Sequence, residues 1–173
     1  MQLKENHSSE RVRIAALVCA AGVGARMGLN MPKQYMRIAG EPMLLLTVRA
    51  LAAITRVESV HVVVSPTDPY IDDVVKHFPT KAVLHRAGGA ERAETVRNGL
   101  SAAGFEPDDW VLVHDAARPC VKGAEIDHLL DEVLGDSSVA GGILAVPMAD
   151  TVKRADERRR ILETVPRKNL WRA

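Results

Sequence analysis

The chain has 173 residues, a formal net charge of +1, 47% hydrophobic residues and only 3% aromatic ones. This length fits one domain with an aliphatic core, and the balanced charge and scarce aromatics argue against a nucleic-acid-binding protein. The longest apolar run, Ile14 to Ala21, is too short to cross a membrane, and Cys19 and Cys120 have no CxxC partner, so we expect a protein of the reducing cytoplasm.

The N-terminal part predicts a polar tail followed by a buried strand. Residues 1–13 are expected to be disordered, ahead of a domain that covers 14–173. Ile14 to Ala20 is a continuous apolar run, typical of a strand buried on both faces. Pro42 is expected to open an amphipathic helix that continues to Ile54. The elements predicted after it are strand 58–64, helix 68–78 with Thr67 or Asp68 as its cap, strand 82–84, helix 91–103, buried strand 110–114, helix 124–134 and strand 142–146.

This alternation of strands and helices indicates the fold class. It predicts an α/β, Rossmann-like fold with a mostly parallel sheet and helices on both faces. In open sheets of this kind, ligands bind at the carboxyl ends of the strands. Three motifs follow predicted strands there: a loop after Ala20, the pair Gly88-Gly89, and Asp115 to Pro119. We therefore expect one site at that edge of the sheet.

From Ala149 onward the pattern changes. Residues 151–154 and 161–165 predict two strands joined by a charged turn, so that about 148–168 would form a projecting β-arm. A lone hairpin is only marginally stable in water. We therefore expect the arm to pack on a second subunit of a homodimer. Because the sequence stops at Ala173 without a closing element, we also expect the C-terminal part of the domain to be missing.

The loop at 20–33 is the most specific motif. Gly22 and Gly24 allow backbone N–H groups to approach a ligand closely, and consecutive N–H groups of this kind form an anion site. Arg26 and Lys33 add two cations. Together they could stabilise a triphosphate and the charge of its transition state.

Other interpretations of this loop can be tested on its residues. A tight turn without any ligand would explain an isolated GxG pair. A dinucleotide-binding fingerprint needs glycine where Met27 stands, and a P-loop needs Ser or Thr after the lysine, where Gln34 stands. The loop therefore matches neither of these common phosphate-binding patterns. An NAD-binding domain is disfavoured by Met27 and by the lack of an acidic residue directly closing the second predicted strand.

The two parts of the loop carry a family resemblance. Ala20-Ala21-Gly22-x-Gly24-x-Arg26-Met27-Gly28, followed by Pro32-Lys33-Gln34-Tyr35, resembles the signature of nucleotidyltransferases that activate sugar and polyol phosphates. The Pro-Lys-Gln-Tyr form is most similar to the 2-C-methyl-D-erythritol 4-phosphate cytidylyltransferase family. The resemblance implies that CTP binds at Ala20, Ala21, Gly22, Gly24, Arg26 and Lys33. It also implies that Arg26 and Lys33 are catalytic, because they would stabilise the transition state.

The segment from Gly88 to Thr95 resembles the second nucleotide motif of the family. Gly88 and Gly89 would let the backbone hydrogen-bond the edge of cytosine, and the resemblance adds Arg92 and Thr95 to the nucleotide site. Taken alone, the segment could equally be a Gly-Gly turn before a helix, with Arg92 as a surface charge.

His114-Asp115-Ala116-Ala117-Arg118-Pro119 is the third match. An aspartate at the end of a strand is well placed to hold Mg²⁺, the expected cofactor, which would bridge the triphosphate. The resemblance implies that Asp115, Ala116 and Arg118 bind the polyol phosphate. In the alternative interpretation Asp115 caps a turn and Arg118 simply pairs with it.

The arm carries the last match, in Asp150 to Arg154 and Val165 to Trp171. The resemblance implies that Thr151 and Arg167 cross to the partner subunit and grip its polyol phosphate, with Arg167 in a catalytic role because it orients the attacking group. The alternative is a hairpin with exposed charges.

The resemblance implies the transfer of CMP from CTP to 2-C-methyl-D-erythritol 4-phosphate, giving 4-diphosphocytidyl-2-C-methyl-D-erythritol and pyrophosphate. Positioning and charge stabilisation would suffice for this in-line attack. Two alternatives stay open at this point: ribitol 5-phosphate as the acceptor, and a non-catalytic fragment that only binds CTP.

Overall fold

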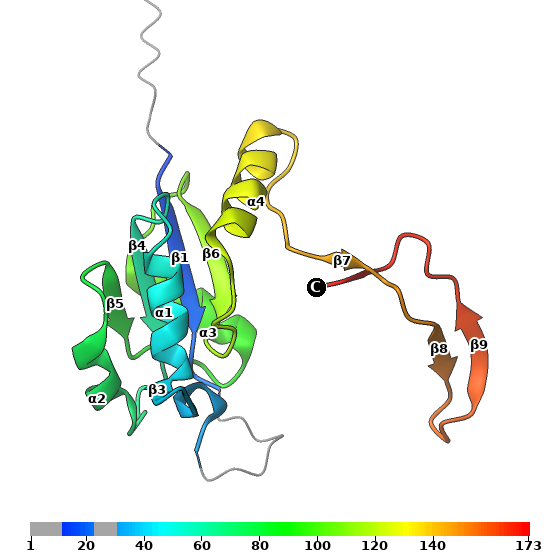
Figure 1. Cartoon of the computed structure of the whole chain (residues 1–173), viewed down its shortest axis with the longest axis horizontal. Coiled ribbons are helices and arrows are strands. Elements are labelled where there is room, and N and C mark those ends of the chain that lie inside the picture. The colour runs from blue at the N-terminus through cyan, green and yellow to red at the C-terminus, as the bar shows by residue number, and fades with distance from the viewer. Residues whose placement is uncertain (1–11, 23–30) are drawn as a thin grey trace, which may run out of the picture. The chain divides into compact units, whose positions relative to one another are not determined.

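The computed structural model describes residues 12–22 and 31–173 (Figure 1). The chain divides after Gly123 into two units. Most of the predicted tail, 1–11, lies outside the described residues, as do Gly24 and Arg26 of the predicted nucleotide loop. Each unit is described by itself. No helix in the described ranges is long and apolar enough to cross a membrane.

The first unit is built on a four-stranded parallel sheet. Its strands β1 (Ile14–Cys19), β4 (Ser59–Val63), β5 (Ala82–His85) and β6 (Trp110–Asp115) lie in the order β5-β4-β1-β6. The central strands β1 and β4 carry the fully buried residues Ala15, Ala16, Leu17, Val18, Val60, Val62 and Val63. The sequence predicted all four strands correctly, and because they are parallel, their carboxyl ends share one edge.

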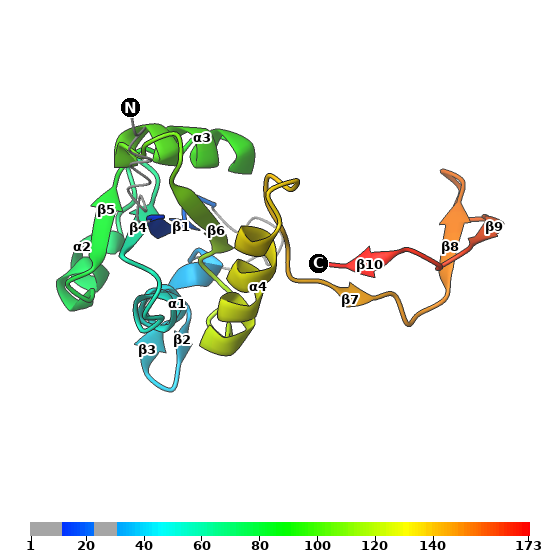
Figure 2. The same ribbon diagram turned by 90° about the horizontal axis from the view of Figure 1, so that it is seen from above.

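Helices α1 (Met43–Ala52) and α3 (Arg92–Ala103) lie on opposite faces of this sheet (Figure 2). Leu44, Val48 and Leu51 form a fully buried stripe along α1, at the spacing of a core-facing helix. Gly99 lets α3 approach the sheet closely, since a Cβ there would lie 2.6 Å from Val63 Cγ2. Gly104 ends α3 in the left-handed conformation, at φ +65°. Both helices confirm the sequence prediction.

Two predictions for the first unit are wrong in detail. The helix expected at 68–78 is only α2 (Ile71–Val74) followed by the 3-10 turn η3 (Val75–His77). Asp68 does not cap it from the predicted position, because one carboxylate oxygen accepts from Tyr70 N at 2.9 Å and the other accepts from a tyrosine hydroxyl. Strand β6 is not fully buried, since it lies at one end of the sheet and its Val113 is 41% exposed.

A short hairpin that the sequence did not predict precedes α1. It consists of β2 (Arg37–Ile38) and β3 (Glu41–Pro42), joined by Ala39 and Gly40. Both joining residues have positive φ, at 51° and 87°, as in the tight turns that suit hairpins. It follows directly on a 3-10 turn, η2 (Lys33–Tyr35), that belongs to the candidate site.

The second unit contains the helix α4 and two antiparallel strand pairs. α4 spans Gly123–Gly135, in agreement with the predicted helix. Strands β8 (Val152–Ala155) and β9 (Ile161–Val165) form the predicted hairpin, and β7 (Val146–Pro147) pairs with β10 (Trp171–Arg172). The strand predicted at 142–146 is wrong except for its last residue. Residues 142–145 pair with no strand of the described chain, and Ile143 is 72% exposed.

Candidate active site

The first two sequence motifs are in direct contact at the carboxyl edge of the sheet. A Cβ built on Gly88 would lie 2.3 Å from Ala21 Cβ and 2.8 Å from Val64 O, so only glycine fits there without displacing backbone. Gly88 N also donates a hydrogen bond to Val64 O at 2.8 Å. The structure thus joins the loop after β1 to the segment after β5, as the parallel sheet predicted.

The buried side-chain amide of Gln34 holds the described part of the first loop in place. Gln34 is 6% exposed, and its Nε2 donates to Ala20 O at 2.8 Å and to Gly22 O at 3.1 Å. Ala20 is itself buried, whereas Gly22 is exposed and Ala21 half-buried. Ala21 and Gly22 are therefore the residues of this segment that can meet a ligand, and Ala20 supports them from the core. The sequence analysis missed the role of Gln34, although it lies in the Pro-Lys-Gln-Tyr motif.

Lys33 lies at the start of η2 with its side chain exposed. A cleft of about 320 Å³ opens beside it, next to the loop. The cleft is lined by Ala21, Gly22, Met31, Pro32, Gln34, Ser65, Thr67, Asp68, Pro69 and Tyr70. Lys33 therefore belongs to a turn that forms one wall of a hollow at the carboxyl edge.

The second motif is braced by the side chains that follow it. Thr95 is 3% exposed, and its hydroxyl accepts a hydrogen bond from Gly89 N at 3.1 Å. Asn98 Nδ2 donates to Ala87 O at 3.0 Å, and Glu94 accepts from Ala90 N at 2.8 Å. Thr95, predicted to contact the nucleotide, thus holds the Gly88-Gly89 backbone in shape from a buried position.

Asp115 connects the second motif to the third. Its Oδ1 lies 2.9 Å from Arg92 Nη2, and its Oδ2 lies 3.1 Å from Arg118 Nε. The pairing that the sequence offered as an alternative for Arg118 is therefore present, with Arg92 in addition. Both guanidinium groups are more than 60% exposed, and exposed ion pairs of this kind contribute little stability. An anionic ligand can compete for both arginines at low cost.

Ala116 and Cys19 complete the end of the sheet next to Asp115. Ala116 is 4% exposed, and its carbonyl accepts from the buried Thr47 hydroxyl at 2.9 Å, so this predicted substrate residue supports the site from the core. Cys19 pairs with Asp115 across the sheet. Burial raises the pKa of the Cys19 thiol, which keeps it protonated and therefore a poor nucleophile. Within 12–22 and 31–173, no cluster of three or more His, Cys, Asp or Glu residues is placed to hold a metal ion.

The two predicted arm residues lie at the open end of the hairpin. Val152 pairs with Val165. Thr151 directly precedes Val152 and Arg167 lies two residues after Val165, so both stand just beyond this pair. Both side chains are exposed, and Arg167 Nη1 donates a hydrogen bond to Ala149 O. The second unit therefore brings Thr151 and Arg167 to the same end of its hairpin.

Comparison with known proteins agrees with these motifs. The family of 2-C-methyl-D-erythritol 4-phosphate cytidylyltransferases matches residues 14–173. The enzymes of that name from Chromobacterium violaceum and Nitrosospira multiformis are 47% and 49% identical to the chain, in each case over 91% of the chain and 69% of the relative. A solved structure of a 4-diphosphocytidyl-2C-methyl-D-erythritol synthase superimposes with a TM-score of 0.78 at 37% identity, over 94% of this chain and 72% of that one.

The match therefore includes the loop after β1, the segment after β5, the end of β6 and the hairpin, although the chain spans only about 69% of the length of these two relatives. Sequence and fold point to the same family independently of the site geometry. The chain belongs to the 2-C-methyl-D-erythritol 4-phosphate cytidylyltransferase family.

Proposed function

We propose that the carboxyl edge of the sheet is where this cytidylyltransferase transfers CMP from CTP to 2-C-methyl-D-erythritol 4-phosphate, with release of pyrophosphate. The observation that carries the proposal is the close packing of Gly88 on Ala21. It joins two glycine-rich segments, and the Arg92–Asp115 pair adds the third motif to them. Exposed Gly22, exposed cations and one carboxylate then lie at the same edge.

The nucleotide occupies the two glycine-rich segments in this proposal. Backbone groups of Ala21, Gly22 and Gly24 face the phosphates. The N–H groups of Gly88 and Gly89 already donate to Val64 O and to the Thr95 hydroxyl, so the carbonyls of these glycines accept from the amino edge of cytosine. Buried Ala20 and Thr95 hold these segments in place. Because Arg92 is exposed and only weakly committed to Asp115, it can turn to the nucleotide when the nucleotide binds.

The chemistry is an in-line substitution at phosphorus. A phosphate oxygen of the acceptor attacks the α-phosphorus of CTP, a new P–O bond forms, and the bond to the bridging oxygen of the β-phosphate breaks to release pyrophosphate. The attacking oxygen is already anionic near neutral pH, so no general base is required. Arg26 and Lys33 stabilise the added negative charge of the transition state. Asp115 and Arg118 adjoin the acceptor, and buried Ala116 supports them from the core.

Asp115 is the candidate protein ligand for Mg²⁺. Mg²⁺ is commonly held by one or two carboxylates together with substrate phosphates and water, and a single exposed aspartate beside a triphosphate fits this pattern. The ion would neutralise charge on the phosphates and align them. Asp115 would then exchange its arginine partners for the metal while Arg92 and Arg118 turn to the substrates.

The second unit supports a homodimer. Ile161, Leu162 and Trp171 are 65%, 64% and 60% exposed, which is unusual for large apolar side chains gathered in a few short strands. We place this surface against a second copy of the chain. Thr151 and Arg167 would then reach the acceptor phosphate bound to the partner, and Arg167 would orient it for attack.

The test is pyrophosphate release from CTP by Lys33→Ala, by Arg167→Ala, and by an equal mixture of the two. Each variant alone should lose about 10²–10³-fold in kcat, the typical cost of removing one preorganised charge-stabilising group. If the arms cross between subunits, a mixed dimer has one intact site, so the mixture should recover about a quarter of normal activity.

Lys168→Ala, at the exposed residue next to Arg167, is the matched control and should remain active. Near-normal kcat in Lys33→Ala would remove this lysine from the mechanism. A mixture no more active than its parts would argue against the crossed arms. Absence of turnover in the unmodified chain, with CTP still bound, would leave only nucleotide binding.

A further inference from the structure

A buried hydrogen-bond network lies directly behind Lys33. In the turn η2 the Lys33 side chain is exposed, while the next two residues, Gln34 and Tyr35, are 6% and 5% exposed. The turn is closed by Tyr35 N donating to Pro32 O at 3.0 Å and by Met36 N donating to Lys33 O at 3.0 Å. In so tight a turn, the position of the lysine follows from where its two buried neighbours are anchored.

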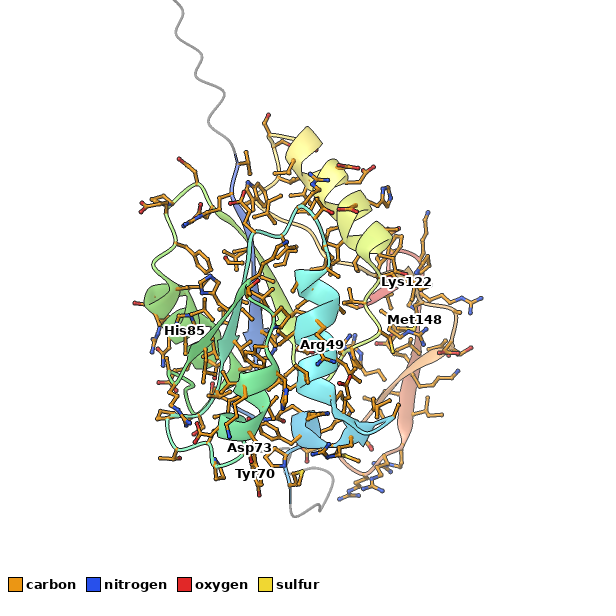
Figure 3. The ribbon with its side chains drawn as sticks, turned by 60° about the vertical axis from the view of Figure 1, so that its left-hand side comes forward. Arg49, Tyr70, Asp73, His85, Lys122 and Met148 are labelled. Atoms are coloured by element: carbon orange, nitrogen blue, oxygen red, sulfur yellow. The ribbon has the colours of Figure 1, made fainter. Side chains whose placement is uncertain are left out.

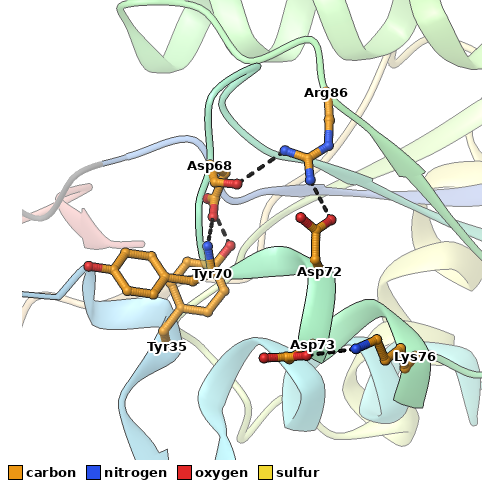
Figure 4. Close-up of polar contacts among 7 residues, drawn as sticks. All are labelled: Tyr35, Asp68, Tyr70, Asp72, Asp73, Lys76 and Arg86. Atoms are coloured by element: carbon orange, nitrogen blue, oxygen red, sulfur yellow. Dashed lines mark hydrogen bonds and ion pairs between the residues drawn. The ribbon is translucent and has the colours of Figure 1, made fainter.

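Tyr35 is anchored on Asp68. Its hydroxyl donates to Asp68 Oδ2 at 2.8 Å, and the aspartate is itself only 8% exposed (Figure 4). Burial, and secondly this carboxylate, raise the pKa of the Tyr35 phenol, so the hydroxyl keeps its proton and acts as the donor. A hydrogen bond to a buried carboxylate is stronger than one between neutral groups. The pair thus fixes the buried end of the turn.

Asp68 is in turn held on two further sides. Its Oδ1 accepts from Tyr70 N at 2.9 Å, and its backbone carbonyl accepts from Arg86 Nη1 at 3.1 Å. Arg86 also pairs with Asp72 at 2.6 Å, and the Tyr35 and Tyr70 rings lie 5.2 Å apart. Tyr70 directly precedes α2, the helix on which Asp73 lies (Figure 3). Asp68, which anchors Tyr35, is therefore itself fixed by hydrogen bonds from Tyr70 and Arg86.

The network reaches both nucleotide segments. Arg86 stands two residues before Gly88, and Gln34, the other buried neighbour of Lys33, donates to Ala20 O and Gly22 O. Lys33 is therefore tied on one side to the loop after β1. On the other side it is tied, through Tyr35, Asp68 and Arg86, to the end of β5. A buried charged group often adds no more stability than well-packed apolar side chains would. Stability alone therefore does not explain the Asp68 carboxylate behind the lysine, and a role in placing the lysine would explain it.

We infer that Tyr35 and Asp68 are positioning residues that set the location of Lys33 relative to the phosphates of the bound nucleotide. The inference rests on the proposed transition-state role of Lys33. Tyr35 and Asp68 do not touch the reacting atoms; they act through the lysine. A displacement of about 1 Å at a charge-stabilising group can cost up to about 100-fold in rate, so loss of the anchoring hydroxyl should lower kcat.

A double-mutant cycle between Tyr35→Phe and Lys33→Ala separates positioning from stability. Tyr35→Phe keeps the ring against Tyr70 and removes only the hydroxyl, and it should lower kcat by about 10- to 100-fold with little change in the KM for CTP. In the Lys33→Ala background the same change should have almost no further effect, because the group that it positions is gone. All kcat values are taken well below the unfolding temperature of each variant.

Asp68→Asn is the second variant. It preserves shape but leaves one acceptor oxygen for two donors, so the Tyr35 hydroxyl keeps a bond by accepting from the new amide. It should therefore lower kcat less than Tyr35→Phe and have no further effect without Lys33. Asp73→Asn is the matched control, because this exposed aspartate pairs with Lys76 and does not line the cleft beside Lys33 (Figure 4). Its kcat should stay normal.

Equal fold-losses for Tyr35→Phe with and without Lys33 would overturn the inference and leave a purely structural pair. That result is distinct from failure of the proposed function, in which Lys33→Ala by itself keeps near-normal kcat.

Discussion

The two units use the same kinds of residue in opposite ways. In β1, Ala15 to Val18 are fully buried, whereas in β9 Ile161 and Leu162 are about two-thirds exposed. In the first unit, buried hydrogen bonds of Gln34 and Tyr35 support the candidate site residues. In the second, the candidate residues stand on a hairpin whose apolar side chains face outward. The first unit therefore holds its candidate site residues in a buried framework, whereas the second presents its candidate residues beside exposed apolar side chains.

The largest expected effect contrasts one leucine from each unit. Leu17→Ala removes a fully buried side chain from the centre of the sheet, and it should lower the free energy of unfolding by about 2–5 kcal/mol. Leu162→Ala removes a side chain that is 64% exposed, and it should change the unfolding of the monomer by less than about 0.5 kcal/mol while weakening self-association. Urea unfolding at low concentration and sedimentation equilibrium measure the two quantities. Equal costs of unfolding would remove the contrast between the units.

Gly88→Ala should have the next largest effect. The new Cβ would meet Ala21 Cβ and Val64 O, neither of which can move without shifting backbone, so a loss of about 1–3 kcal/mol in unfolding free energy is expected, with weaker CTP binding. The counterpart in the second unit is Gly135→Ala, where no atom lies within 4 Å of the added Cβ. Thermal unfolding and CTP titration of both variants test this. Unchanged CTP affinity in Gly88→Ala would mean that the two glycine-rich segments need not touch.

The comparison also explains which elements the sequence could predict. The strands of the first unit were recognised because a continuous apolar run such as 14–20 records burial on both faces. The same reasoning failed at 142–146, where an apolar segment pairs with no described strand before Val146. An apolar run records a tendency to be buried, and it does not say which neighbour buries it. The helix predicted at 68–78 is limited to 71–74 and the 3-10 turn at 75–77. Asp68, expected as its cap, instead accepts from Tyr35, 33 residues away, and no local pattern shows such a contact.

The candidate site was predictable in its grouping but less so in its roles. Parallel strands alone placed the three motifs at one edge. Whether a residue faces the ligand or supports it from the core depends on its depth, which the motif does not encode: Ala20, Thr95 and Ala116 are buried supports. Gln34 and Asp68 were missed because each acts through hydrogen bonds to residues distant in sequence. The ligand-binding and catalytic roles of all these residues stay predictions, and Gly24 and Arg26 also lie outside the described residues.

The smallest effect, a pH dependence, again separates the units. In the first unit His61 Nδ1 lies 2.9 Å from His85 Nε2, and the His61 ring is 9% exposed and packs edge-on against Phe105. Burial lowers the pKa of both histidines, and His85 and Arg13 lower that of His61 further. One ring nitrogen must donate to the other, so two charged rings would bring two N–H groups face to face.

Protonation of this pair therefore opposes folding. The unfolded chain takes up protons as pH falls through about 6.5, whereas the folded pair resists them. Stability should be complete above that pH and decline below it, by up to about 1.4 kcal/mol per pH unit for each histidine. Urea unfolding at pH 7.5 and pH 5.5 should show a smaller decline for His61→Asn than for the unmodified chain. His128→Asn, at an exposed position on α4, should leave the decline intact. An equal decline in all three proteins would mean that acid sensitivity comes from elsewhere, and the buried pair would lose its distinction from the exposed histidine of the second unit.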